Sequence, residues 1–401
     1  MTNLIKNEQI SAGKYPFKYI LSPYAGAKWL LVVFSAFAPD KSPNQHIYNF
    51  MNVLESVPAH KLYIQDSQGQ RGVYYLCRQL DFGVSEEVCD LIQSIQKKLD
   101  CDADHTVSIG SSKGGSAALY FALRLKFAHA LSMVPQFRIG TYLDCPGKQS
   151  VLEEMVGTQD IPAGVKILDG IIEAELKKNT TTKVHVLTSH FDEQYETQIA
   201  PLEQAVVTHQ RQAQCKLRFD DRIKGHNGAA NHNADFVHEK LMGILFDCNL
   251  SVKDGFLTLT RSQPDTSEFN IIYLVEKWDG TSQEYHLKDQ QYTFPIQELS
   301  YTELTVWKDQ KVIYQRYFCD WLSNLLHVEC SKSKDGIQLA FVQDSSCTLP
   351  MQYSFYVRNR NNEVLERVSP SAKAEYCISN SDLDGGSIQY FFKYKNYVYW
   401  D

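Results

Sequence analysis

Residues 110 to 114 read Gly-Ser-Ser-Lys-Gly, a G-x-S-x-G pattern that places a serine between two glycines. His105 to Ile109, just before it, have the β-branched and apolar character of a short buried strand. From Gly115 the apolar residues recur at helical spacing. A serine in such a sharp turn is presented at the edge of a sheet, beside helix N–H groups that favour negative charge. The pattern therefore predicts Ser112 as a nucleophile.

A glycine-rich turn that contains a lysine has two other interpretations. One is a phosphate-binding loop, which requires G-x-x-x-x-G-K-[ST]. Here Lys113 precedes the glycine pair instead of following it, so that interpretation fails. The other is a purely structural turn, which the motif alone does not exclude.

A serine nucleophile needs a base and an acid, and the chain supplies both after later strands. Three residues each follow a different expected strand and could act together as nucleophile, acid and base: Ser112, Asp192 and His226, in that order along the chain. This order of serine, acid and histidine is typical of α/β-hydrolases. Glu193 is the alternative acid and His232 the alternative base. Metal-assisted chemistry at His226, His232, Asp235 and His238 is disfavoured, because their spacing matches no zinc pattern; no metal is expected.

Two further sets of residues are expected beside the serine. The oxyanion of an acyl-transfer reaction would be bound by backbone N–H groups of Lys113 and of the loop after an early strand, at Ser35 or Ala36. Two aromatic residues in loops after early strands are expected to bind substrate: Phe37 and Tyr75.

Strands and helices alternate through residue 247, which specifies a doubly wound, mostly parallel α/β sheet. Strands are expected at residues 17–21, 29–35, 60–66, 105–109, 129–137, 183–190 and 215–223. Helices are expected at 45–57, 86–101, 115–127, 147–157, 161–178, 197–212 and in a last segment that ends at 246. Ser85 is a plausible N-cap of the second helix.

From Cys248 onward helical periodicity disappears and alternating strands dominate. The segment repeats itself, since SVKDGFLTLT at residue 251 matches SKDGIQLAFV at residue 333. We therefore expect an α/β domain at 1–247 and two small all-β, immunoglobulin-like sandwich modules at 248–321 and 322–401. The modules are rich in aromatic side chains that either stack on sugars or fill the cores: Trp278, Tyr285, Trp307, Tyr390, Phe391 and Tyr394.

Composition narrows the classes of partner. A net charge of −7 gives no electrostatic reason to expect nucleic acid. The N-terminus has no apolar signal-peptide core, and the run from Trp29 to Ala38 is too short to span a bilayer. The 10 cysteines are scattered singly and indicate reduced core residues in a cytoplasmic protein, with a peripheral position at the inner membrane as the variant of that expectation.

The stretch from Tyr63 to Leu143, with SIGSSKGGSAALYFALRLK and VPQFRIGTYL, resembles α/β-hydrolase-like proteins of bacterial capsule biosynthesis loci. It is also similar to the glycan O-acetyltransferase component of accessory secretion systems. The resemblance is sharpest over about 80 residues and looser around the acid and the histidine. It implies a Ser112-Asp192-His226 enzyme that acylates a surface polysaccharide, with Gln136 of the V-P-Q motif lining the acceptor site.

The resemblance also implies a co-substrate and partners. No permanently bound cofactor is expected, and acetyl-CoA is a candidate donor. The acceptor would be a capsular or related polysaccharide, and the β modules are candidates for docking onto other capsule-assembly proteins. Two alternatives stay open: a carbohydrate esterase acting on the same glycans, and a non-catalytic scaffold of the assembly complex.

Overall fold

The computed structural model describes most of the chain: residues 5–37, 48–220, 222–246, 248–253, 255–261, 270–287, 291–308, 310–318, 326–332, 336–343, 350–358, 364–379, 387–394 and 397–400. It divides into two compact units, Met1–Leu241 and Met242–Asp401. The boundary falls inside helix α8 (Asn233–Phe246), close to the domain boundary expected at residue 247. The expected module boundary at 321 lies outside the described residues.

The first unit is built on one mixed eight-stranded sheet in the order β1-β2-β4-β3-β5-β6-β7-β8. Its strands are β1 (Glu8–Ile10), β2 (Lys18–Ser22), β3 (Leu30–Phe34), β4 (His60–Gln65), β5 (Thr106–Ser111), β6 (His129–Met133), β7 (Lys183–Thr188) and β8 (Cys215–Phe219). Strand β2 pairs antiparallel with β1 and with β4. The remaining neighbours in the sheet, from β4 through β3, β5, β6 and β7 to β8, pair in parallel. The expected α/β sheet is thus confirmed, and the carboxyl ends of its parallel strands meet at one edge.

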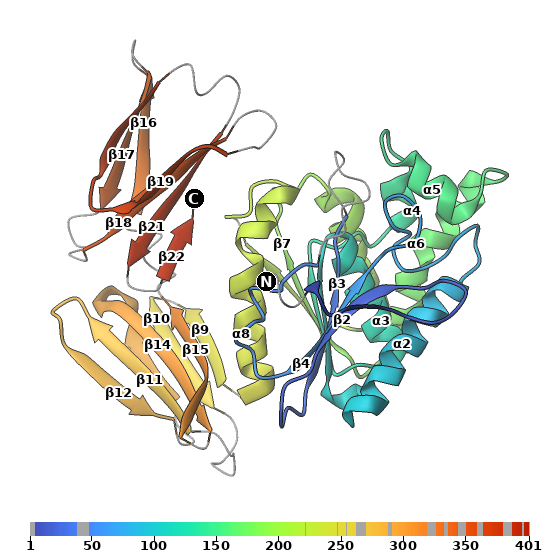
Figure 1. Cartoon of the computed structure of the whole chain (residues 1–401), viewed down its shortest axis with the longest axis horizontal. Helices are drawn as coiled ribbons and strands as arrows, with labels where there is room; N and C mark the ends of the chain where they lie inside the picture. The colour runs from blue at the N-terminus through green and yellow to red at the C-terminus, as the bar shows by residue number, and fades with distance from the viewer. Residues whose placement is uncertain are drawn as a thin grey trace. The chain divides into compact units, whose positions relative to one another are not determined.

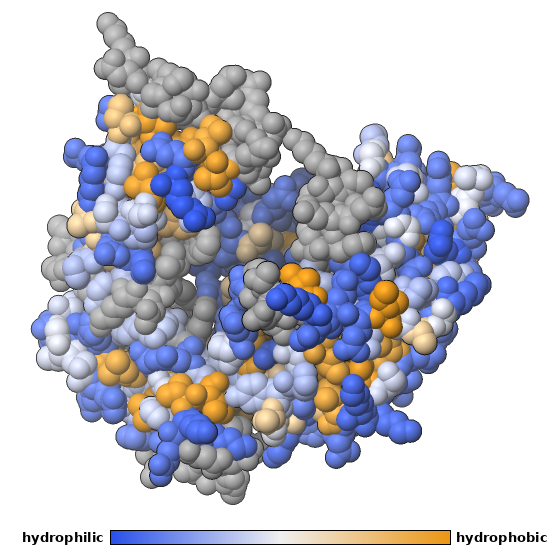
Figure 2. Space-filling model, in the orientation of Figure 1, coloured by the Kyte–Doolittle hydropathy of each residue, from blue (hydrophilic) through white to orange (hydrophobic). Residues whose placement is uncertain are grey.

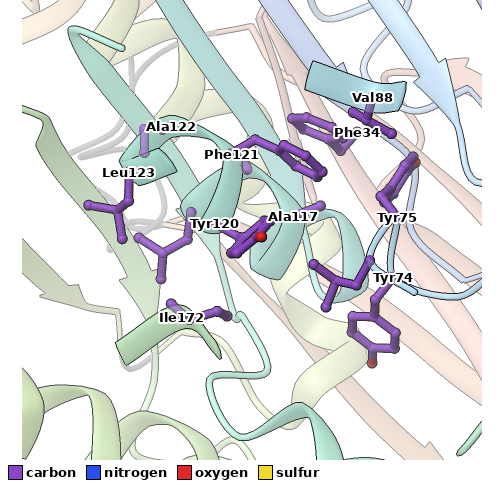
Figure 3. Packing of buried hydrophobic residues seen from close by; sticks show 14 of the residues in the cluster. Phe34, Tyr74, Tyr75, Val88, Ala117, Tyr120, Phe121, Ala122, Leu123 and Ile172 are labelled. Atoms are coloured by element: carbon purple, nitrogen blue, oxygen red, sulfur yellow. The ribbon is translucent and has the colours of Figure 1, made fainter. Parts of the chain in front are cut away.

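Helices cover both faces of this sheet, with α2 and α3 on one side and α8 on the other (Figure 1). The remaining bounds are α2 (Gly83–Leu99), α3 (Lys113–Leu125), α4 (Ile139–Leu143), α5 (Gln149–Val156), α6 (Ile161–Lys178) and α7 (Ala200–Thr208). The β3 side chains are buried throughout, because helices cover that strand on both faces. Phe34 of β3 stacks on Phe121 of α3 with ring centroids 5.2 Å apart, and Figure 3 shows the two rings side by side.

Two local predictions are wrong. The described part of the helix expected at 45–57 forms turns from residue 49, and Phe50 has a φ of 62°, which a right-handed helix does not accommodate. Residues 45–47 lie outside the described residues. Helix α2 is capped at Phe82, and Ser85 lies inside it, where its Oγ donates to the Phe82 carbonyl at 2.9 Å.

The second unit consists of antiparallel sheets in two sets. The first set is β13-β10-β9 and β12-β11-β14-β15, and the second is β20-β17-β16 and β19-β18-β21-β22. Their strands are β9 (Cys248–Lys253), β10 (Phe256–Arg261), β11 (Asn270–Lys277), β12 (Ser282–His286), β13 (Gln291–Pro295), β14 (Leu299–Lys308), β15 (Lys311–Phe318), β16 (Leu326–Lys332), β17 (Gly336–Gln343), β18 (Gln352–Arg358), β19 (Val364–Ser371), β20 (Glu375–Ser379), β21 (Ser387–Tyr394) and β22 (Tyr397–Trp400). The second set repeats the first strand for strand, so the sequence repeat is a structural repeat.

The strand order of each set differs from that of a constant-type immunoglobulin domain. There the fourth strand joins the sheet of the first, second and fifth strands. Here the fourth strands, β12 and β19, instead pair with the third strands, β11 and β18. Each repeat is therefore a three-plus-four arrangement, and its relation to immunoglobulin-like sandwiches stays a prediction.

Several aromatic residues of the second unit pack between its sheets. The Phe341 ring of β17 lies 5.1 Å from Tyr353 of β18 and 5.4 Å from Phe392 of β21, measured between centroids, which joins the two sheets of the second set. None of the six aromatics singled out in the sequence is exposed: Trp278, Tyr285, Trp307, Tyr390, Phe391 and Tyr394. Phe391 and Tyr394 are buried and therefore belong to the core, whereas the other four are half-buried.

The surface view is mostly hydrophilic with separate apolar patches (Figure 2). No helix in the described part of the chain is long and apolar enough to cross a membrane. Among the described cysteines, four are buried: Cys77, Cys89, Cys215 and Cys248. Cys101 and Cys145 are half-buried, and Cys330 and Cys377 are exposed, so the expectation of core cysteines is wrong for these four.

Candidate active site

Ser112 occupies a strained turn between β5 and α3. Its backbone has φ 55° and ψ −123°, outside the regions that non-glycine residues favour. The flanking glycines are required by close approach, since a Cβ on Gly110 would lie 2.0 Å from the Gly114 carbonyl oxygen. A Cβ on Gly114 would lie 2.5 Å from the Phe34 carbonyl oxygen. The G-x-S-x-G turn therefore holds the serine at the carboxyl end of a central strand.

The structure brings the three complementary side chains together. His226 Nε2 lies 2.8 Å from Ser112 Oγ, and His226 Nδ1 lies 2.9 Å from Asp192 Oδ2. The Asp192 side chain is 1% exposed and that of His226 is 12% exposed. A carboxylate only accepts hydrogen bonds, so Nδ1 carries the proton and Nε2 is free to accept the serine hydroxyl proton.

The alternative acid and base have other partners. Glu193 Oε2 accepts the backbone N–H of His226 at 2.8 Å, so it orients the histidine loop instead of the ring. His232 ends the short helix His226–Asn231, and its main electrostatic neighbours include Arg222 and Asp220. Burial lowers the pKa of His232, and the charge of Arg222 adds to that effect. The geometry therefore favours Asp192 and His226.

The carboxylate of Asp220, directly after β8, also has a partner other than His226. Asp220 makes a two-pronged contact with Arg222, at 2.9 Å from Nε and 2.7 Å from Nη2. Burial alone would raise the pKa of Asp220, but the hydrogen bonds and charge of Arg222 outweigh it and lower the pKa to about 2. Asp221 lies outside the described residues.

The expected second oxyanion donors are already engaged. The buried Ser35 N–H donates to the Tyr75 hydroxyl at 2.8 Å, and the Ala36 N–H donates to Asn49 Oδ1 at 2.8 Å. The geometry thus does not support Ser35 as a donor, and it supports Ala36 only if the Asn49 side chain is displaced. Lys113 is the first residue of α3, where a backbone N–H has no partner within the helix. Its N–H remains the supported candidate.

Tyr75 does not line a substrate site as expected. Its side chain is 0% exposed, and its hydroxyl accepts from Ser35 N–H and donates to the Ile64 carbonyl at 3.0 Å. It therefore ties the loop after β4 to the loop after β3. Phe37, by contrast, is half-buried, so part of its side chain is accessible. Its ring packs edge-on against Tyr74, with ring centroids 5.4 Å apart.

An ion pair beneath the elbow has no counterpart in the sequence analysis. The Lys113 side chain is 2% exposed, and its Nζ lies 3.0 Å from Asp66 Oδ2 at the end of β4. Burial lowers the pKa of Lys113, while the charge of Asp66 opposes this shift. The same carboxylate oxygen accepts the Tyr75 backbone N–H at 3.3 Å. The sequence feature that could have indicated this ion pair is Asp66, a charged residue directly after the buried strand β4.

Gln136, which the resemblance places in the acceptor site, is buried and touches the nucleophile. Its Nε2 lies 3.0 Å from Ser112 Oγ and 2.9 Å from Gln194 Oε1. Gln194 was not singled out from the sequence, although it lies two residues after Asp192. In the described part of the chain, no group of three or more His, Cys, Asp or Glu side chains is placed to hold a metal ion.

No protein-family model and no curated protein matches the chain. Solved structures with a similar fold include the capsule O-acetyltransferase of Neisseria meningitidis serogroup A, at 19% identity over 60% of this chain and 99% of that one, with a TM-score of 0.49. The glycosylation-associated Gap123 complex from Streptococcus agalactiae matches at 16% identity over 60% of this chain and 47% of that one, with a TM-score of 0.50. Serine hydrolase FphF of Staphylococcus aureus matches at 13% identity over 59% and 96%, with a TM-score of 0.43. At such identities, similarity concerns the fold alone.

Proposed function

We propose that the protein is a serine acyltransferase of the α/β-hydrolase type that O-acetylates a bacterial capsular or related surface polysaccharide. The observation that carries the proposal is the continuous hydrogen-bonded series Ser112 Oγ, His226 Nε2, His226 Nδ1 and Asp192 Oδ2, with separations of 2.8 and 2.9 Å. Nucleophile, base and orienting acid in contact, on a strained elbow at a helix N-terminus, are the geometric requirements of acyl-enzyme chemistry.

In the first half-reaction, Ser112 Oγ attacks the acyl carbonyl of the donor while His226 Nε2 takes the hydroxyl proton. Asp192 stabilises the imidazolium that forms. The tetrahedral oxyanion is bound by the Lys113 N–H at the start of α3. When the intermediate collapses, His226 returns the proton to the leaving group, which is a thiol if acetyl-CoA is the donor, and acyl-Ser112 remains.

In the second half-reaction, a sugar hydroxyl takes the place of the donor's leaving group. His226 accepts its proton as its oxygen attacks the acyl-Ser112 carbonyl, and then returns the proton to Ser112 Oγ. With water as acceptor, the same steps give hydrolysis, so an esterase is the second candidate.

The choice of polysaccharide rests on the resemblance of residues 63–143. A role for the β modules in docking to capsule-assembly proteins belongs to the same proposal.

The test supplies acetyl-CoA, or an activated acetyl ester, with and without purified capsular polysaccharides, and follows both free acetate and polysaccharide-bound O-acetyl groups. The proposal predicts O-acetylated polysaccharide that depends on Ser112 and His226. Free acetate alone, unaffected by any acceptor, would assign the protein as an esterase. No turnover with any donor would favour the scaffold alternative.

A further inference from the structure

The buried amide of Gln136 closes a hydrogen-bonded ring around the nucleophile. One arc runs from Ser112 Oγ through His226 to Asp192 Oδ2. The other runs from Asp192 Oδ1, which accepts the Gln194 backbone N–H at 2.9 Å, through Gln194 Oε1 to Gln136 Nε2 and back to Ser112 Oγ. Acid and nucleophile are therefore joined by two independent routes.

The surroundings of Gln136 fix its position. The residue is 0% exposed, and its backbone N–H donates to Ser116 Oγ at 2.9 Å on the first turn of α3. Its side-chain oxygen accepts the Tyr74 hydroxyl at 3.3 Å, which leaves the Nε2 group for Ser112 and Gln194. Tyr74 is itself fully buried. A buried amide with both ends engaged has little freedom to rotate away from the serine.

We infer that Gln136 is a further catalytic residue, which donates a hydrogen bond to Ser112 Oγ and thereby directs the serine proton to His226. An amide N–H can only donate, so Oγ accepts at that contact. The single hydroxyl hydrogen of Ser112 then has His226 Nε2, at 2.8 Å, as its acceptor. The same N–H stabilises negative charge on Oγ as the proton leaves. This inference rests on the proposed function, because it concerns the same nucleophile.

The experiment measures the second-order rate of Ser112 labelling by a fluorophosphonate, which needs no sugar acceptor, across pH 5.5 to 9. Gln136→Met keeps the length of the side chain without a donor, and we expect its rate to fall about ten- to a hundredfold. Gln136→Glu is closer in shape but places an acceptor against Oγ. Its rate should fall below that of Gln136→Met at alkaline pH, and this difference should narrow as the carboxyl group protonates.

Gln96→Met is the matched control, because Gln96 is a buried amide that donates to Thr106 Oγ1 at 2.8 Å and makes no contact with Ser112 in the described structure. It should label at the wild-type rate, and thermal melts of all variants identify any that fail to fold. A folded Gln136→Met that labels like wild type, or a Gln136→Glu that labels faster than Gln136→Met at pH 9, would overturn the inference. Labelling of wild type that persists in Ser112→Ala would instead refute the proposed function.

Discussion

The two sides of Ser112 are held by different kinds of interaction. Toward β6, β7 and β8, neutral amides and the Asp192 carboxylate form the ring that controls the serine proton. Toward β3 and β4, the Lys113–Asp66 ion pair and the Tyr75 hydroxyl lock two loops together. On the proton-transfer side, hydrogen-bonding groups contact Ser112 Oγ itself. On the opposite side, the charged side chains of Lys113 and Asp66 pair with each other. The side-chain contacts that direct the proton and those that tie the two loops together thus lie on opposite sides of Ser112.

The largest expected effect is on the proton-transfer side. His226→Ala removes the base, and we expect the rate of acyl-enzyme formation to fall by about four orders of magnitude or more. His232→Ala should change that rate by less than about tenfold, because its ring interacts electrostatically with Arg222 and Asp220. Stopped-flow measurements of ester cleavage compare the two. Equal losses in both variants would contradict the assignment of the base.

On the opposite side, Asp66→Asn should act on stability. It leaves the buried Lys113 ammonium without its counter-charge, and we expect the free energy of unfolding to fall by about 3–5 kcal/mol. The double variant Asp66→Leu with Lys113→Met should recover much of this loss, since neither charge stays buried. Urea titrations measure both. A double variant as unstable as Asp66→Asn would show that the ion pair does more than neutralise one buried charge.

The last effect depends on pH and tests the amino ends of the strands that carry the proton-transfer side. His129 of β6 and His185 of β7 stack there, with Nδ1 and Nε2 3.3 Å apart. Burial lowers the pKa of His129 to about 4 and that of His185 to about 3, from an ordinary 6.5. Below pH 6.5 the unfolded chain therefore binds protons that the folded chain excludes. Stability should fall toward pH 4, by up to about 1.4 kcal/mol per pH unit for each histidine.

Urea titrations from pH 7.5 to 4.5 measure that slope. The double variant His129→Asn with His185→Asn should flatten it, even though the variant is less stable at pH 7.5. Substitution of the exposed His286 by Asn is the control and should leave the slope unchanged. An unaltered slope in the double variant would mean that other groups account for the acid sensitivity.

Periodic patterns made the sheet and the elbow predictable. The alternation of strands and helices predicts that Ser112, Asp192 and His226 lie at one sheet edge, because parallel strands share a carboxyl edge. The ring through Gln194 was not predictable in this way. Its contacts join loops 58 residues apart, and glutamines have no characteristic spacing. Tyr75 is buried although the sequence predicts an accessible side chain, because a loop position usually indicates exposure.

The helix expected at 45–57 failed for a related reason. Apolar residues at helical spacing described the segment, but Phe50 adopts a left-handed conformation, and Asn49 satisfies the Ala36 N–H at the end of β3. Tertiary hydrogen bonding overrode local periodicity. The same loop decides whether Ala36 has an N–H available for an oxyanion.

Intact-protein mass spectrometry after incubation with an activated acetyl ester tests the central claim most directly. The account predicts an added mass of about 42 Da, one acetyl group, on the wild-type chain. It predicts no such adduct on Ser112→Ala, and peptide mapping should place the acetyl group on the 110–114 turn. An adduct of equal yield on Ser112→Ala, or no adduct on a folded wild-type protein with several donors, would contradict a serine acyl-enzyme.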